Sequence, residues 1–176
     1  MNYHNILHAD IKNGEGLRVT LFVSGCTHKC KNCFNPETHD FSSGIPFDDD
    51  AVKEIEKELS NDYISGLSIL GGSPLHPKNI ETVTDLCMMV KEKFPNKNIW
   101  IWTGYLFEQV KDFPVMNYID VLVDGKFVEE LKDVKLHWRG SSNQKIYRKV
   151  NGEWRVDENE DSGLERRSTI KCCNSR

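Results

Sequence analysis

Arg18-Val-Thr-Leu-Phe-Val-Ser24 leads through Gly25 into Cys26-Thr-His-Lys-Cys30-Lys-Asn-Cys33, so a strand-like run is followed directly by three closely spaced thiols. The run alternates and is rich in β-branched and aromatic residues, which predicts a strand. Three thiolates in one short loop can hold a 4Fe–4S cluster, and they leave one of its four irons without a protein ligand. An iron with an open position can bind and act on a small molecule. We therefore predict Cys26, Cys30 and Cys33 as the metal ligands.

A structural zinc site is the main alternative for the same loop. Tetrahedral zinc accepts three cysteines and one histidine, and His28 and His39 are both nearby. Zinc sites usually present two well-separated Cys pairs, whereas all three thiols here fall within eight residues, so the spacing favours the cluster. A disulfide framework is disfavoured because it leaves one thiol over and the N-terminus does not resemble a secretory signal.

The composition predicts one domain in a reducing compartment. The chain has 176 residues, of which 38% are apolar, enough for a core. The net charge is −4 and the basic residues are dispersed, which gives no nucleic-acid footprint. No apolar stretch reaches the roughly 20 residues of a membrane span. Six cysteines without a signal peptide predict a cytoplasmic protein whose thiols are available to metals.

The rest of the pattern alternates strands with helices. Helices are predicted over 48–59, with Asp48 as N-cap, and over 79–94. Three more strands are predicted, each followed by a glycine-containing turn: 64–70 before Gly71-Gly72, 98–102 before Thr103-Gly104, and 120–124 before Gly125. This order predicts an α/β fold with a mostly parallel sheet, in which the loops after the strands meet at one edge. We also expect Trp100 and Trp102 to point to opposite sides of their strand.

The length limits how far this sheet can close. A complete (β/α)₈ barrel needs about 250 residues, so we expect a partial, laterally open (β/α) barrel over residues 1–150. The open side could dock a segment of another protein. Residues 151–176 have an acidic run and few apolar residues, which predicts a flexible C-terminal extension.

Together these motifs resemble the radical S-adenosylmethionine enzymes, and within them the branch that activates anaerobic ribonucleoside-triphosphate reductase. The resemblance covers residues 1 to about 150. It is carried by the cysteine loop and by six stretches: Asn13-Gly-Glu-Gly-Leu-Arg18, Leu21-Phe-Val-Ser-Gly-Cys26, Gly71-Gly-Ser-Pro-Leu-His-Pro77, Trp100-Ile-Trp-Thr-Gly-Tyr105, Val123-Asp-Gly-Lys-Phe127 and Trp138-Arg-Gly-Ser-Ser-Asn-Gln144.

The resemblance implies a radical S-adenosylmethionine domain of the open-barrel type. It implies that S-adenosylmethionine binds the open iron through its amine and carboxylate. It also implies cofactor contacts at Asn32, Cys33 and Phe34, near the adenine, and at Gly71 and Gly72. The implied reaction is reductive cleavage of S-adenosylmethionine, followed by formation of a glycyl radical on the reductase, with no catalytic residue beyond the cofactor.

The implied partners are the large subunit of the reductase and an electron donor such as flavodoxin, with no nucleic acid and no membrane. Two alternatives stay open: an activase of another glycyl-radical enzyme, such as pyruvate formate-lyase, and a non-catalytic zinc or iron–sulfur module. A fourth thiolate from Cys172 or Cys173 would favour the module. Ser73 departs from the family, which usually has an acidic residue there to bind the methionine ammonium.

Overall fold

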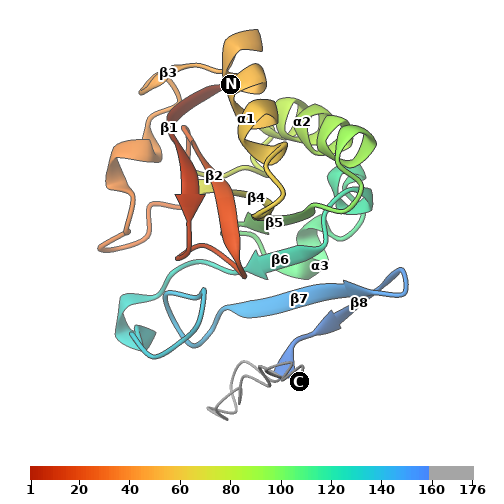
Figure 1. Ribbon diagram of the computed structural model, residues 1–176. Helices are drawn as coiled ribbons and strands as arrows, with labels where there is room; N and C mark the ends of the chain where they lie inside the picture. Colours follow the sequence, from red (N-terminus) through yellow and green to blue (C-terminus); the bar gives the residue numbers. More distant parts are fainter. Residues whose placement is uncertain (159–176) are drawn as a thin grey trace, which may run out of the picture.

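The fold is α/β, with one mixed sheet of eight strands that does not close (Figure 1). The computed structural model describes residues 1–158. The strand order is β3-β1-β2-β4-β5-β6-β7-β8. The strands are β1 (Asn2–Asp10), β2 (Leu17–Val23), β3 (Ile45–Pro46), β4 (Ile64–Gly71), β5 (Asn98–Trp102), β6 (Val121–Asp124), β7 (Lys145–Val150) and β8 (Glu153–Val156). The α-helices are α1 (Asp49–Leu59), α2 (Ile80–Lys93) and α3 (Phe107–Val110), and short 3₁₀ helices occur at Pro36–His39, Pro114–Asn117 and Glu129–Leu131.

The centre of the sheet matches the sequence prediction, but its flanks do not. Strands β2, β4, β5 and β6 are parallel neighbours, so their carboxyl ends lie at one edge. Strands β1 and β3 on one side, and β7 and β8 on the other, pair antiparallel. The prediction of a mostly parallel sheet is therefore wrong for the whole sheet, which is mixed. The flanking strands escaped detection because neither β1 nor β7 alternates cleanly between buried and exposed residues.

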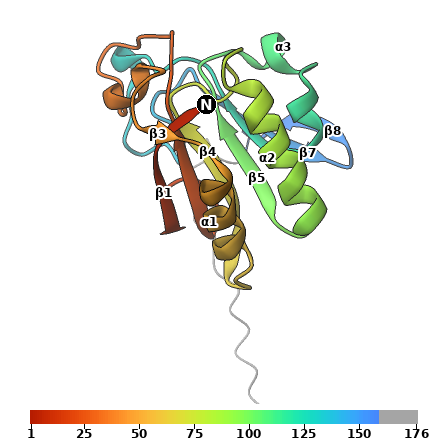
Figure 2. The ribbon, with the colours of Figure 1, turned by 90° about the horizontal axis from the view of Figure 1, so that it is seen from above.

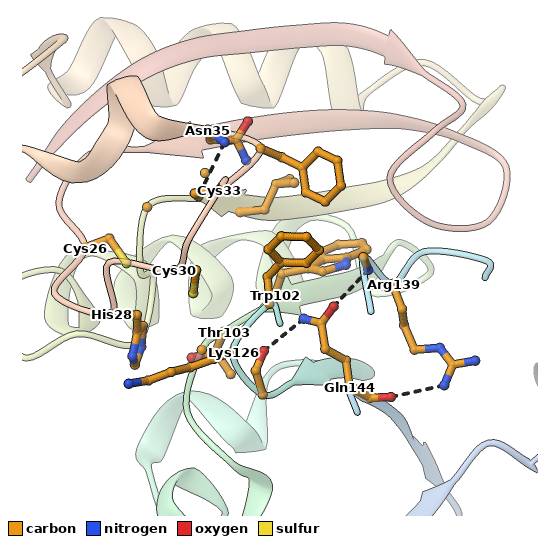
Figure 3. A pocket seen from close by; sticks show the side chains of 18 of the residues that line it. Cys26, His28, Cys30, Cys33, Asn35, Trp102, Thr103, Lys126, Arg139 and Gln144 are labelled. Atoms are coloured by element: carbon orange, nitrogen blue, oxygen red, sulfur yellow. Dashed lines mark hydrogen bonds between the residues drawn. The ribbon is translucent and has the colours of Figure 1, made fainter. Parts of the chain in front are cut away.

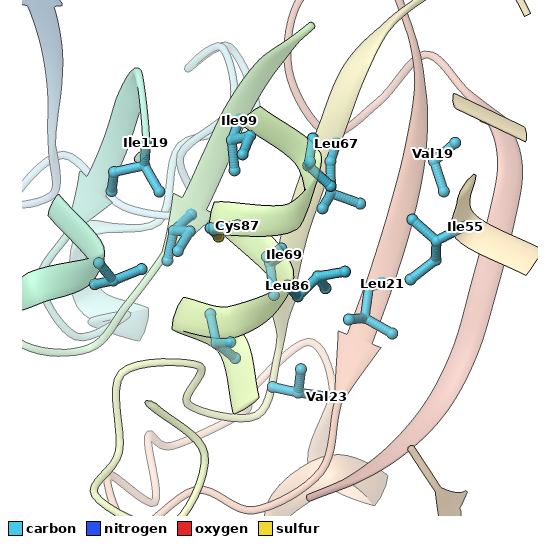
Figure 4. Packing of buried hydrophobic residues seen from close by; sticks show 14 of the residues in the cluster. Val19, Leu21, Val23, Ile55, Leu67, Ile69, Leu86, Cys87, Ile99 and Ile119 are labelled. Carbon is cyan, nitrogen blue, oxygen red and sulfur yellow. The ribbon is translucent and has the colours of Figure 1, made fainter. Parts of the chain in front are cut away.

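Helices α1 and α2 cover one face of the sheet (Figure 2). The predicted N-cap is confirmed, because the Asp48 carboxylate accepts hydrogen bonds from the backbone N–H groups of Asp50 and Ala51. Ile55 from α1 and Leu86 from α2 belong to the core with the inward side chains of the parallel strands (Figure 4). No helix within residues 1–158 combines the length and apolar character needed to cross a bilayer.

The other face of the sheet carries a tryptophan cluster. Trp100 and Trp102 stack with ring centroids 5.6 Å apart, and Trp138 meets Trp100 edge-on at 5.0 Å. The expectation that Trp100 and Trp102 face opposite ways is wrong, because residues two apart on a strand share a face. The cluster forms a wall on the side of the sheet that the helices leave open.

The predicted domain boundary at residue 150 falls inside a hairpin. Strands β7 and β8 pair from Tyr147↔Val156 to Val150↔Glu153, and the chain turns at Asn151 and Gly152. The first residues of the predicted extension therefore continue the sheet. The rest of the extension, with Cys172 and Cys173, lies outside the described residues.

A buried arginine joins the amino ends of the parallel strands. Arg18 is 0% exposed and donates to Ser68 Oγ at 2.6 Å, to Asn98 Oδ1 at 2.7 Å and to the carbonyl of Leu67 at 2.8 Å. Its guanidinium also lies over the Trp100 ring, 5.4 Å from the centroid. Burial lowers the pKa of Arg18 to about 10, so it remains charged at neutral pH.

Replacing Arg18 tests how much it contributes to the stability of the fold. Arg18→Met should lower the free energy of unfolding by about 3 kcal/mol, because buried carbonyl and side-chain acceptors lose a charged donor. Chemical denaturation followed by circular dichroism measures the change. Arg155→Met, whose side chain is 63% exposed in its pair with Glu153, is the matched control. It should cost less than about 0.5 kcal/mol, and equal losses for the two variants would contradict the assignment.

Candidate metal centre

Four loops at the carboxyl edge of the parallel strands line one cavity of about 510 Å³ (Figure 3). The cysteine loop follows β2, Gly71-Gly72 ends β4, Thr103-Gly104 follows β5, and Gly125-Lys126 follows β6. The predicted convergence of these loops is confirmed. The volume lies within the range of roughly 300–1,000 Å³ that small-molecule and cofactor sites occupy.

Backbone hydrogen bonds hold the start of the cysteine loop from two sides. Ser73 N–H donates to the carbonyl of Gly25 at 2.8 Å, which ties the loop to the Gly-Gly turn. Gly25 N–H donates to the carbonyl of Thr38 at 2.7 Å, and Cys26 N–H donates to the carbonyl of His39 at 3.0 Å. Cys26 is thus fixed between the end of β4 and the 3₁₀ helix Pro36–His39.

Both glycines of the turn are needed for this close approach. A Cβ on Gly72 would lie 2.7 Å from the carbonyl oxygen of Gly25. Gly71 has a φ of 98°, and a Cβ there would lie 2.9 Å from the carbonyl oxygen of Val23. Packing of the chain against itself therefore accounts for Gly71 and Gly72, and their contact with a cofactor stays a prediction.

The three thiols of the loop all line the cavity and are free. Burial raises the pKa of Cys26 and of Cys33. Backbone N–H groups oppose this shift, from His28 and Lys29 at Cys26 and from Asn35 at Cys33, where N and Sγ are 3.5 Å apart. Such N–H groups stabilise sulfur ligands of iron–sulfur clusters.

The three thiols of the loop differ from the fourth thiol of the described residues in that they line the cavity. Within residues 1–158, no three His, Cys, Asp or Glu side chains are arranged round the position of a single metal ion, and this holds for the three cysteines of the loop as well. Cys87 is fully buried in the core on α2, where burial raises its pKa, and it does not line the cavity. Cys26, Cys30 and Cys33 are therefore the thiols that the described chain offers to a cluster.

The charge and polarity of the lining suit an anionic group. Among the described residues that line the cavity, Lys12, Lys126 and Arg139 carry positive charge and none carries a carboxylate. The buried Nε2 of His28 has no hydrogen-bond partner within residues 1–158, so it remains available to a bound group. Burial, helped by Lys126 and His76, lowers the pKa of His28. A cluster held by three thiolates would bring negative charge next to these three cations.

The predicted cofactor contacts are only partly brought together. Cys33, Phe34, Gly71 and Gly72 line the cavity, but Asn32 does not. The Asn32 side chain instead donates a hydrogen bond to Glu129. Phe34 is 58% exposed and packs against Phe127, with ring centroids 5.0 Å apart.

Other residues of the lining went unrecognised in the sequence. Trp102 and Trp138 form one wall, and Trp102 Nε1 donates to the carbonyl of Trp138 at 2.7 Å. Gln144 accepts from Gly140 N–H at 2.8 Å and donates to the carbonyl of Gly125 at 2.9 Å, so it shapes the wall. The position of Lys126 after a strand and a glycine was the available signal for that residue.

Ser73, the departure from the family pattern, faces the interior. It is 0% exposed, it does not line the cavity, and its Oγ has no hydrogen-bond partner within residues 1–158. In this orientation the Ser73 hydroxyl cannot contact a ligand in the cavity. The backbone of the turn is what this segment presents to the cavity.

Comparison with known proteins agrees with this geometry. A family model described as a 4Fe-4S single cluster domain matches residues 12–147. The anaerobic ribonucleoside-triphosphate reductase-activating protein of Enterobacteria phage T4 is 46% identical over 157 residues, which cover 89% of this chain and 100% of the phage protein. The proteins of the same name from Haemophilus influenzae and Escherichia coli are 47% and 45% identical, over 84% of this chain and 98% of each relative.

The chain belongs to the family of anaerobic ribonucleoside-triphosphate reductase-activating proteins. The branch assigned from the sequence motifs is thereby confirmed. The chain is thus an activating protein with a 4Fe–4S domain, and its cysteine loop lies within the residues that match the cluster domain.

The turn behind the cysteine loop offers a direct test of the site. Gly72→Ala should abolish stable cluster uptake, because the added Cβ displaces the carbonyl of Gly25 that positions Cys26. Anaerobic reconstitution followed by iron and sulfide analysis measures uptake. Gly152→Ala is the control: its Cβ meets nothing within 4 Å, so only its φ of 83° is unfavourable. Normal uptake by Gly72→Ala would contradict the described role of the turn.

Proposed function

We propose that this chain activates anaerobic ribonucleoside-triphosphate reductase as a radical S-adenosylmethionine enzyme, with a catalytic domain that spans residues 1–150 and continues into the β7–β8 hairpin. When bound, the reduced 4Fe–4S cluster supplies one electron that splits S-adenosylmethionine into methionine and a 5′-deoxyadenosyl radical, which takes a hydrogen atom from a glycine of the reductase. The proposal extends the family assignment to a reaction. The chain's own residues would bind, orient and shield the reactants.

The observation that carries the proposal is the number and placement of the thiols. Cys26, Cys30 and Cys33 line a cavity with room for a second molecule, and the other thiol of the described chain, Cys87, is buried elsewhere. Three thiolates leave one of four irons open. A closed set of four would serve electron transfer or structure, whereas an open iron beside a cavity supports binding and cleavage of a small molecule.

The remaining lining supplies orientation. Gly71 and Gly72 bring backbone to the cavity, and under this proposal their carbonyls receive the methionine ammonium in place of the acidic side chain that Ser73 replaces. Lys126 is one of the cations that line the cavity and can pair with a carboxylate. Phe34 lies at the same cavity and offers a ring for the adenine.

The proposed partners follow from the shape of the site. The sheet is open, so the cavity can admit a segment of a large protein, and the name of the relatives indicates the reductase as that protein. The electron would come from a donor such as flavodoxin. A reducing, anaerobic cytoplasm is the compartment in which this chemistry could run, because free thiols and an exposed cluster need protection from oxidation.

The reaction is tested by reconstituting the protein anaerobically and reducing it in the presence of S-adenosylmethionine. We expect one 4Fe–4S cluster per chain and release of 5′-deoxyadenosine, and a glycyl radical signal once the reductase is added. Cys26→Ala, Cys30→Ala and Cys33→Ala should each lower release at least about 100-fold, because the loss of one thiolate removes a cluster ligand.

Two further variants decide between the alternatives. Cys87→Ala should retain the cluster and the cleavage, since its thiol lies in the core. Cys172→Ser/Cys173→Ser should also retain both; loss of the cluster would instead support a fourth ligand and a non-catalytic module. Retention of zinc with no cleavage would contradict the proposal. Cleavage without a radical on this reductase would favour another glycyl-radical enzyme as the substrate.

A further inference from the structure

The chain between β6 and β7, residues 125–144, forms a strap that lies against the second half of the cysteine loop. The strap is internally tied: Val128 N–H donates to Ser141 Oγ at 3.1 Å, and Ser142 N–H donates to the carbonyl of Leu131 at 2.9 Å. Trp102 Nε1 anchors it to β5 through the carbonyl of Trp138. The strap is therefore one wall of the cavity, and the cysteine loop is the facing wall.

One carboxylate joins the two walls. The Asn32 side chain donates to Glu129 Oε1, and Lys31 Nζ lies 3.0 Å from Glu129 Oε2. The hydrogen bond from Asn32 and then the ion pair with Lys31 hold the pKa of Glu129 below its ordinary value, so the carboxylate is ionised at neutral pH. Glu130 also approaches Lys31, at 3.5 Å, but its side chain is 68% exposed.

Apolar contacts place this junction beside the last two thiols. Phe34 packs on Phe127, and Lys132 Nζ lies 5.2 Å from the centroid of the Phe34 ring. Gly140 makes room for both rings, since a Cβ there would lie 2.9 Å from Phe127 and 2.9 Å from Phe34. The segment 31–34, which contains Cys33, thus contacts the strap on both sides of the thiol.

The backbone conformation of the cysteine loop explains why contacts from the strap are needed to keep it in place. Lys29 and Asn32 have φ values of 50° and 51°, in the left-handed region that most side chains avoid. After glycine, asparagine and aspartate tolerate this region best. Two local hydrogen bonds hold segment 31–33, from Cys33 N–H to the carbonyl of Cys30 at 3.3 Å and from Asn35 N–H to Cys33 Sγ at 3.5 Å. The side chains of Lys31 and Asn32 bind the strap.

We propose that Glu129 is a positioning residue for the cluster: through Asn32 it fixes the turn between Cys30 and Cys33 and sets the distance between the cysteine loop and the strap. The proposal rests on the function proposed above in that the loop holds a cluster. It assigns the Asn32 side chain to the strap, where it binds Glu129.

A reversal of the pair tests this role. Asn32→Asp keeps a residue suited to the left-handed backbone but sets two carboxylates against each other. It should speed iron release to a chelator about fivefold and increase deuterium uptake of residues 126–144. Asn32→Asp/Glu129→Gln restores one donor and one acceptor in reversed order, so both rates should return to within about twofold of the wild-type values. Glu130→Gln is the matched control and should behave as the wild-type protein.

The outcomes separate this inference from the proposed reaction. Equal iron release and deuterium uptake in the wild-type protein and Asn32→Asp would overturn the inference, as would a double variant no better than Asn32→Asp. Deuterium exchange is also measured on the protein without the cluster. There too, residues 126–144 should take up more deuterium in Asn32→Asp than in the wild-type protein, the double variant or Glu130→Gln. A wild-type protein that holds its cluster but fails to cleave S-adenosylmethionine would refute the proposed reaction alone.

Discussion

The hydrogen bond from Ser73 N–H to the carbonyl of Gly25 joins the ends of the two parallel strands on which the site depends. Strands β2 and β4 are in register to Val23↔Gly71, and this bond continues the pairing one step beyond them. Only a residue without a Cβ fits at Gly72, because the carbonyl of Gly25 is so close. The cysteine loop therefore begins from a fixed point, at which Cys26 is already placed.

The parallel centre of the sheet turns this fixed point into a site. Because the carboxyl ends of β2, β4, β5 and β6 share one edge, loops distant in sequence face one cavity. The opposite edge is closed by the buried Arg18, which binds acceptors on β4 and β5. The buried arginine that joins the strands and the cavity that holds the thiols therefore lie at opposite ends of the same strands. The cations that line the cavity are complementary in charge to thiolates.

Local patterns revealed the centre of the fold, and longer-range contacts escaped them. The parallel strands, α1 and α2 have strong periodicity, and Asp48 caps α1, so the sequence predicted these elements and the loops that converge on the cavity. Strand β7 mixes buried and charged residues, and the hairpin to β8 crosses the boundary predicted at residue 150. The contact of Asn32 with Glu129 spans 97 positions, and no local spacing encodes such a pair.

The central claim is that the loop provides three thiolates and leaves one iron for S-adenosylmethionine. Electron–nuclear double resonance on the reduced, oxygen-free protein tests it most directly, with ¹⁵N in the amine and ¹⁷O in the carboxylate of the added S-adenosylmethionine. We expect both labels to couple to the cluster. Four irons that all carry protein ligands, with neither label coupled, would contradict it.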